Sequence, residues 1–340
     1  MIKPWVFEFV PEPSDGSAGP DYFRQYVDLW ARDEELGFEG VFFSEHHFGG
    51  SFSSCPHLLV AATAMRTRRL RLGVMGVVTA WYQPLRLLEE IGLLDQLSGG
   101  RFEIGVSVGV PQELARLNIS MEQARAINEE TLEILERALP VSRLDHQGER
   151  FSYRDLRVLP PVVQRPRPPL WTTIVSEGSA RGAARRGRRI TTGFHGQDKV
   201  ACIFDAYREE TDLAGFAGGP DMLGLRRRVV VAETRARAKE MSDAVIERYR
   251  QFTASDSRMK LAAIPDETKG KDAFEISADE FIEGTPADVA ENIVAQCRRT
   301  GAGHFLAVLH WSAGFDEVRA AHELFGSDVI PALRSASIGP

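Results

Sequence analysis

The 340-residue chain carries 41 Lys and Arg against 48 Asp and Glu, a formal net charge of -7, and 43% of its residues are hydrophobic. This composition is typical of a globular protein, and the acidic balance argues against a nucleic-acid surface, which needs basic residues to replace phosphate counterions. The three cysteines are far apart, with no spacing that suggests a zinc site or a disulfide framework, and this favours a reducing cytoplasm. The N-terminal residues reach Glu8 before a signal-peptide core could form, and no apolar run approaches the roughly 20 residues that span a bilayer. We therefore expect a cytoplasmic protein that does not enter the membrane.

Short apolar runs alternate with amphipathic segments along the whole chain. Strands are predicted at 5–10, from 41 onward, and at 70–78, 102–108, 170–175, 190–193, 227–233 and 304–309. Helices are predicted at 21–36, 56–65, from 84 to Gly99, and at 121–139, 179–186, 198–213, 235–249, 286–301 and 315–333. The turn-rich segment 145–169 is interpreted as a surface hairpin followed by an extended connection.

Eight strands that alternate with helices indicate a parallel sheet. Closure into a (β/α)8 TIM barrel explains the count better than an open doubly wound sheet does. We expect one barrel domain over residues 1–340. The polar stretch 253–284, before the last strand, is interpreted as a mobile insertion within it.

The second predicted strand ends in Glu45, His46 and His47. Active sites of barrels gather where strands end, and neighbouring strand residues point to opposite sides, so at most one of the two histidines is expected to face the barrel mouth. The functional interpretation is an imidazole that exchanges a proton and is oriented by a nearby carboxylate. The two histidines could instead be structural and bond to loop carbonyls, or they could belong to a metal site, for which no third ligand is evident.

Two further stretches could contact a ligand. Gly105, Ser107 and Gly109 share one side of a strand, which would let a planar ligand lie against the backbone or a helix pack closely. Residues 176–181 join the fifth strand to its helix. Their serine hydroxyls, free N–H groups and Arg181 could cradle a phosphate, or Ser176 and Ser179 could simply cap the helix.

Several segments, in the same order, resemble the bacterial luciferase-like flavin-dependent monooxygenases. They are Glu45-His46-His47-Phe48, the run from Gln83 to Phe102 with its Leu94-Asp95-Gln96-Leu97-Ser98-Gly99-Gly100-Arg101 block, Gly284-Thr285-Pro286, and the ending Phe325-Gly326-Ser327-Asp328-Val329-Ile330-Pro331. The likeness spans nearly the whole chain.

The resemblance implies a dimeric (β/α)8 barrel with reduced flavin in its mouth. It assigns His46 as the catalytic histidine, Ser107 to the neighbourhood of the flavin ring, and a non-prolyl cis peptide bond to Met75–Gly76. The flavin and phosphate segment would comprise Val175, Glu177, Gly178, Ser179 and Arg181. Luciferase has an arginine at the position of Val108, so phosphate binding here would depend more on that segment.

By this resemblance we expect a monooxygenase that uses reduced FMN, supplied by a flavin reductase, and O2. A flavin hydroperoxide would transfer one oxygen atom to a small organic substrate, with no metal. Glu45 and His47 would support His46, and His310 and Trp311 could line the same mouth. The competing possibilities are an F420-dependent hydride-transfer enzyme and a non-catalytic flavin-binding protein.

Overall fold

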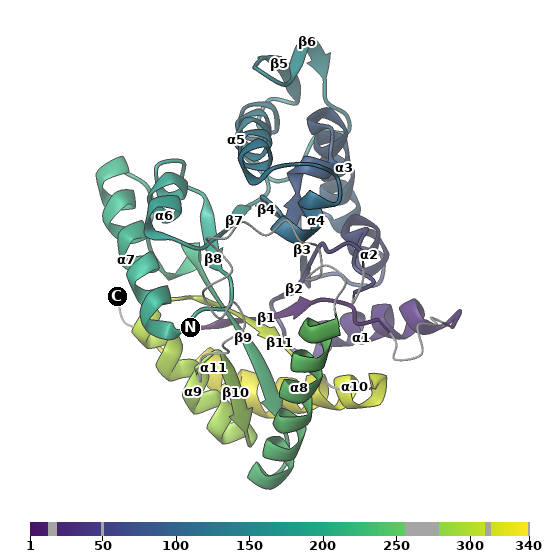
Figure 1. Ribbon diagram of the computed structural model, residues 1–340, viewed down its shortest axis with the longest axis vertical. Helices are drawn as coiled ribbons and strands as arrows, with labels where there is room; N and C mark the ends of the chain where they lie inside the picture. The colour runs from purple at the N-terminus through teal and green to yellow at the C-terminus, as the bar shows by residue number, and fades with distance from the viewer. Residues whose placement is uncertain (13–18, 49–50, 256–278, 310–313, 339–340) are drawn as a thin grey trace.

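Eight parallel strands close into a barrel in the computed structural model, which describes residues 1–12, 19–48, 51–255, 279–309 and 314–338 (Figure 1). The strands are β1 (Lys3–Glu8), β2 (Gly40–Phe43), β3 (Arg71–Val78), β4 (Phe102–Ser107), β7 (Leu170–Ile174), β8 (Arg189–Thr192), β9 (Leu223–Val231) and β11 (His304–Val308). They pair in the order β1-β2-β3-β4-β7-β8-β9-β11, and β11 pairs with β1 to complete the ring. The predicted (β/α)8 barrel is confirmed.

Helices surround the barrel in Figure 1. They are α1 (Tyr22–Leu36), α2 (Pro56–Ala64), α3 (Pro84–Ser98), α4 (Pro111–Ala115), α5 (Met121–Ala138), α6 (Glu177–Ala184), α7 (Gln197–Ala214), α8 (Arg235–Ser255), α9 (Pro286–Thr300), α10 (Phe315–Leu324) and α11 (Ile330–Ser335). Local signals place their ends: Thr285 caps α9, Pro286 opens it, and Gly301 ends it with φ of 72°. No helix among the described residues has both the length and the apolar character to cross a membrane.

Two parts of the chain differ from the prediction. Phe281–Gly284 forms an additional strand, β10, which pairs in parallel with β9, so the expected insertion ends in regular structure. Residues 253–255 of that insertion close α8, and 256–278 lie outside the described residues. The last predicted helix is divided into α10 and α11 by a π-helical turn at Phe325–Val329. The predicted hairpin forms from β5 (Arg143–Gln147) and β6 (Ser152–Arg157), at the top of Figure 1.

Large side chains fill the barrel interior. One buried cluster lies inside the ring of strands and comprises Trp5, Phe7, Phe42, Met75, Trp171, Leu306 and Val308. Trp5 stacks on Phe42 with ring centroids 4.5 Å apart. Burying a side chain of this size contributes about 1.5–3 kcal/mol to the free energy of unfolding. Because these side chains fill the interior, it is a packed core and not a pore.

A charged network closes the amino end of the barrel. The buried carboxylate of Glu103 accepts hydrogen bonds from Trp171 Nε1 at 2.5 Å, from Arg189 Nη1 at 3.1 Å, and from Arg71. A buried carboxylate is stable only when it is paired in this way. All three partners come from neighbouring barrel strands, so the network also ties β3, β4, β7 and β8 together.

Candidate active site

His46 lies three residues beyond β2, at the carboxyl end of the barrel. Its ring stacks on Phe9 with centroids 5.6 Å apart, and Phe9 in turn contacts the interior residue Phe7. The Nδ1 atom lies 3.1 Å from Oε1 of Glu113. The His46 side chain is 25% exposed and that of Glu113 only 1%. Among the described residues, no hydrogen bond to Nε2 of His46 is present.

Glu113 was not predicted as a site residue. It lies in α4, a five-residue helix that Pro111 opens directly after the β4 loop. The sequence signal was weak, because only the fold brings this carboxylate next to His46, 67 residues earlier. The pair has the geometry of a proton-exchanging imidazole whose tautomer is fixed by a carboxylate.

Glu45 and His47, which were predicted as supports of His46, form a pair of their own. His47 Nε2 lies 3.0 Å from Glu45 Oε1, and its ring stacks on Trp81 at 4.3 Å. Glu45 also accepts a hydrogen bond from the last backbone N–H of β3 at 3.1 Å and from the Tyr82 hydroxyl at 3.2 Å. Burial, together with the Glu45 charge, raises the pKa of Tyr82. This pair therefore anchors the loop that carries His46.

The side of β4 that carries Gly105 is packed against β3. The Met75–Gly76 peptide bond is cis, as the resemblance implied. A Cβ on Gly105 would lie 2.6 Å from the Met75 sulfur, and a Cβ on Gly76 would lie 2.8 Å from the carbonyl carbon at the facing position of β4. The atoms packed against Gly105 belong to Met75 and Val74 of β3 and not to a helix. Ser107 Oγ accepts the Gly109 N–H at 3.0 Å, at the strand end.

The amino terminus of α6 is open to solvent. Ser176 and Ser179 form a capping box, with reciprocal distances of 3.3 and 3.2 Å, so both serines cap the helix, and phosphate binding at this terminus stays a prediction. A Cβ on Gly178 would meet nothing within 4 Å. The guanidinium of Arg181 lies 2.8 Å from Glu209 of α7, and this pairing with α7 was not expected from the sequence.

Val175 and Glu177 complete the predicted phosphate segment. Val175 follows β7 and is 58% exposed, which is unusual for a valine next to a barrel strand. Glu177 is the exposed first residue of α6. His310 and Trp311 lie outside the described residues. No three His, Cys, Asp or Glu side chains of the described chain come together as a metal site.

The family model of the luciferase-like monooxygenases matches residues 5–304. This chain belongs to that family. Relatives of this luciferase-like monooxygenase include the protein y4wF of Sinorhizobium fredii, 31% identical with 88% of each chain covered. Another relative is the alkanal monooxygenase alpha chain of Photorhabdus luminescens, 25% identical with 92% of each chain covered.

Solved structures agree with the fold of this luciferase-like monooxygenase. Monooxygenase RslO1 from Streptomyces bottropensis has a TM-score of 0.84 at 25% identity, covering 97% of this chain and 99% of its own. The oxygenating component of 3,6-diketocamphane monooxygenase from Pseudomonas putida, in complex with FMN, has a TM-score of 0.79 at 22% identity, covering 97% and 98%. The F420-dependent tetrahydromethanopterin reductase of Methanopyrus kandleri has a TM-score of 0.74 at 15% identity, covering 98% and 99%. The family supports an oxidoreductase activity.

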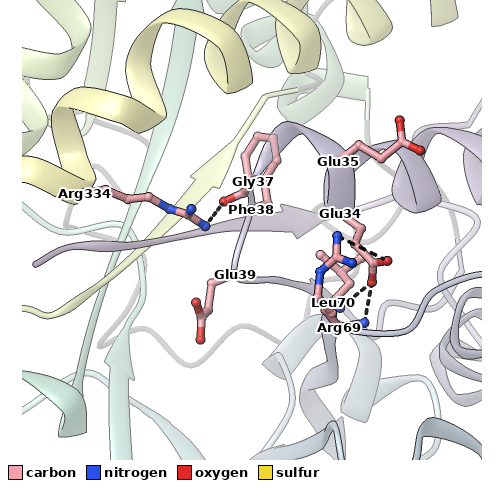
Figure 2. Close-up of a pocket in the computed structure, with 8 residues that line it drawn as sticks. All are labelled: Glu34, Glu35, Gly37, Phe38, Glu39, Arg69, Leu70 and Arg334. Atoms are coloured by element: carbon pink, nitrogen blue, oxygen red, sulfur yellow. Dashed lines mark hydrogen bonds and ion pairs between the residues drawn. The ribbon is translucent and has the colours of Figure 1, made fainter.

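A hollow at the opposite end of this luciferase-like monooxygenase is structural (Figure 2). It lies beside the segments that precede β2 and β3, at the amino end of the barrel. Glu34 accepts the Leu70 N–H at 2.7 Å, and Arg334 donates to the Gly37 carbonyl at 2.7 Å. The lining residues are Glu34, Glu35, Gly37, Phe38, Glu39, Arg69, Leu70 and Arg334. These contacts join α1 and α11 to the loops before β3 and β2.

Proposed function

We propose that the protein is a flavin-dependent monooxygenase that takes reduced FMN from a separate reductase and uses O2 to oxygenate a small organic substrate. The observation that carries this proposal is the His46–Glu113 pair at the barrel mouth, in a chain that belongs to the luciferase-like family. The alkanal monooxygenase relative and the FMN complex of a fold neighbour support the choice of reaction and cofactor.

The two residues of the pair would have different tasks. Reduced flavin, when bound, supplies the electrons that activate O2. Glu113 holds His46 through Nδ1, so that Nε2 carries the proton exchange with an oxygen atom in the mouth. The ring of Phe9 under the imidazole fixes its plane and keeps water from that side.

The amino terminus of α6 fits the phosphate of the cofactor. The first N–H groups of the helix have no intrahelical acceptor, and the space beside Gly178 is open. Arg181 would reach the phosphate only by leaving Glu209 and Glu210, to which it is bound at 2.8 and 3.7 Å. The serines and backbone amides are therefore the groups that would hold an FMN phosphate.

A second candidate is an F420-dependent hydride-transfer enzyme. It is favoured by the fold likeness to the F420-dependent reductase, and F420 also carries a phosphate that the α6 terminus could hold. Anaerobic titration with reduced FMN and with reduced F420, monitored by tryptophan fluorescence, distinguishes the FMN proposal from the F420 proposal. Tight binding of reduced FMN, with slowed reoxidation after mixing with O2, is expected. Tight binding of F420 without binding of FMN would refute the FMN proposal.

Catalysis is tested with His46→Gln and, as a matched control, His146→Gln in the distant β5 strand. The first variant should retain flavin binding and lose oxygen transfer to aldehydes and ketones, whereas the second should retain both. Retained activity in His46→Gln would contradict the role of His46. Flavin binding without substrate-dependent oxygen consumption in the unmodified protein would favour a non-catalytic flavin-binding protein. The homodimer stays a prediction, which sedimentation of the unmodified protein tests.

A further inference from the structure

Two of the three consecutive arginines on β9 face the barrel interior. Arg226 pairs in register with Leu306 and Arg228 with Val308, and both of these β11 residues belong to the interior cluster. Arg227 between them points to the outside, where its Nε donates to Gln296 at 2.6 Å. Positive charge is therefore built into the upper part of the barrel interior.

Arg226 is buried and has no counterion in the part of the chain that the structure describes. It is 9% exposed, and its guanidinium lies 4.5 Å from the ring centroid of Phe7 and 4.7 Å from that of Phe194. Its Nε atom is buried without a hydrogen-bond partner, and no carboxylate of the described residues forms an ion pair with Arg226. Burial, with the neighbouring charges of Arg228 and Arg227, lowers the pKa of Arg226 to about 9, so it stays charged at neutral pH.

A buried guanidinium of this kind lowers the stability of the fold unless a ligand supplies the missing acceptors and negative charge. An uncompensated buried charge destabilises a protein, and a guanidinium that lacks acceptors leaves several N–H groups unsatisfied. Cation–π contacts with two rings offset only part of this cost. The neighbouring Arg228 is different, because it forms an ion pair with Glu280 at 3.4 Å.

A second unsatisfied group points to the same space. Nε2 of His195 is buried without a partner, and burial, with the charges of Lys199 and Arg226, lowers the pKa of His195 to about 4, so its ring is neutral. Gly193 lies between the two: a Cβ built on it would be 3.8 Å from Nη2 of Arg226 and 3.8 Å from Nε2 of His195, and apart from Thr192 and Phe194 no described residue is nearer. The two nitrogens therefore lie on either side of Gly193, beside the position that its missing side chain leaves open among the described residues.

This space lies across the mouth from His46. In the ring of strands β8 is four places from β2, so the segment after β8 faces the segment after β2. Phe9 and Phe7 connect the two sides: Phe9 packs under His46, Phe7 packs under Arg226, and the two rings are 5.1 Å apart. A small molecule on this aromatic floor could reach both His46 and Arg226.

We propose that Arg226 and His195 form an anion subsite that binds an oxyanion of the substrate, foremost a carboxylate, while the reacting part lies beside His46. The planar fork of Arg226 matches a carboxylate in two parallel hydrogen bonds, and neutral His195 can donate a third through Nε2–H. The inference rests on the proposed function for the reaction that follows. It adds the class of substrate, an organic anion.

Benzoate and its neutral isostere benzamide test the subsite on the flavin-free protein. Tryptophan fluorescence and thermal shift measure binding to the unmodified chain and to Arg226→Gln, Arg226→Lys and Arg185→Gln. The last variant removes the same charge from an exposed surface position. Benzoate should bind the unmodified protein and Arg185→Gln equally, and benzamide should bind neither. Arg226→Gln should weaken benzoate binding at least about 30-fold, because truncating one partner of a desolvated charge pair costs that much or more. Arg226→Lys keeps the charge without the fork and should fall between.

Equal binding of benzoate and benzamide, or unchanged benzoate affinity in Arg226→Gln, would overturn the proposal. If Arg226→Gln instead weakens the binding of reduced FMN, and benzoate competes with FMN, then the arginine binds the cofactor phosphate and the proposal fails. Benzoate binding needs neither flavin nor O2, so its failure is distinct from a failure of oxygen transfer. The comparison of benzoate with benzamide on the unmodified protein decides the matter even if a variant does not fold.

Discussion

Replacing Glu113 with glutamine tests whether the His46–Glu113 contact contributes to catalysis. The Nδ1···Oε1 distance is 3.1 Å, and the carboxylate is almost entirely buried, so solvent screens the contact weakly. The substitution Glu113→Gln keeps the size of the side chain and removes its charge. A hydrogen bond to a charged group is worth about 1.5–3 kcal/mol. If the imidazole carries a proton in the rate-limiting step, kcat should therefore fall about 10- to 150-fold.

In the assay, the complex between the protein and reduced FMN is mixed with O2. Flavin reoxidation and oxygen transfer to a panel of aldehydes and ketones are then followed. Glu122→Gln, an exposed change of the same kind in α5, is the control, and Glu113→Asp should restore part of the rate. Flavin affinity and KM should stay constant while kcat and its pH profile change. An unchanged kcat in Glu113→Gln, or an equal loss in Glu122→Gln, would refute the reasoning.

Three further predictions concern stability and reactivity. Asp33 and His322 are both fully buried and 2.8 Å apart, so Asp33→Asn should lower the free energy of unfolding by about 3–5 kcal/mol; a loss in urea unfolding below about 1 kcal/mol would contradict this. Gly105→Ala should lower the melting temperature, because the new Cβ would lie 2.6 Å from a sulfur and a carbonyl oxygen. Gly178→Ala should leave the melting temperature unchanged, because nothing lies within 4 Å of the new Cβ. Equal melting temperatures of the two variants would argue against the close packing at Gly105. Burial raises the pKa of Cys297 to about 12, so a thiol reagent at pH 8 should modify only the two exposed cysteines until urea unfolds the chain; modification of three in the folded protein would be inconsistent with this burial.

Helix ends could be predicted closely because their signals are local. Gly37, Gly99 and Gly301 each follow a helix in the left-handed conformation that glycine adopts most readily, and each was predicted as a stop. The eight barrel strands were also recognisable as short apolar runs. Strand β10 was not, because four residues at the end of a polar stretch give too short a pattern.

The partners of the site residues could not be predicted. His46 was identified from its place after a strand, but its carboxylate comes from α4, in a loop without a recognisable motif. Similarly, Arg181 was expected at a phosphate, whereas the structure pairs it with Glu209, 28 residues later. Such contacts depend on how α4 and α7 pack, which a single sequence does not encode in any local pattern.

Arg226 shows a further limit of pattern reading. The seventh strand was predicted to begin at Arg227, because the valines after it mark a buried run, whereas β9 begins at Leu223. Arginine next to apolar residues usually marks a strand end. Here Arg226 lies inside the barrel, where its guanidinium packs on the rings of Phe7 and Phe194.

The closed amino end of the barrel has a consequence for the order of events. In the described part of the chain, Glu103, Trp171 and Arg189 close the base of the barrel, so the rim that carries His46 is the expected route into the interior. A bulky cofactor and a smaller substrate would then share one entrance, and whichever enters second traps the first. A single route of entry favours a compulsory order of binding and release, which initial-rate kinetics with both ligands varied would reveal.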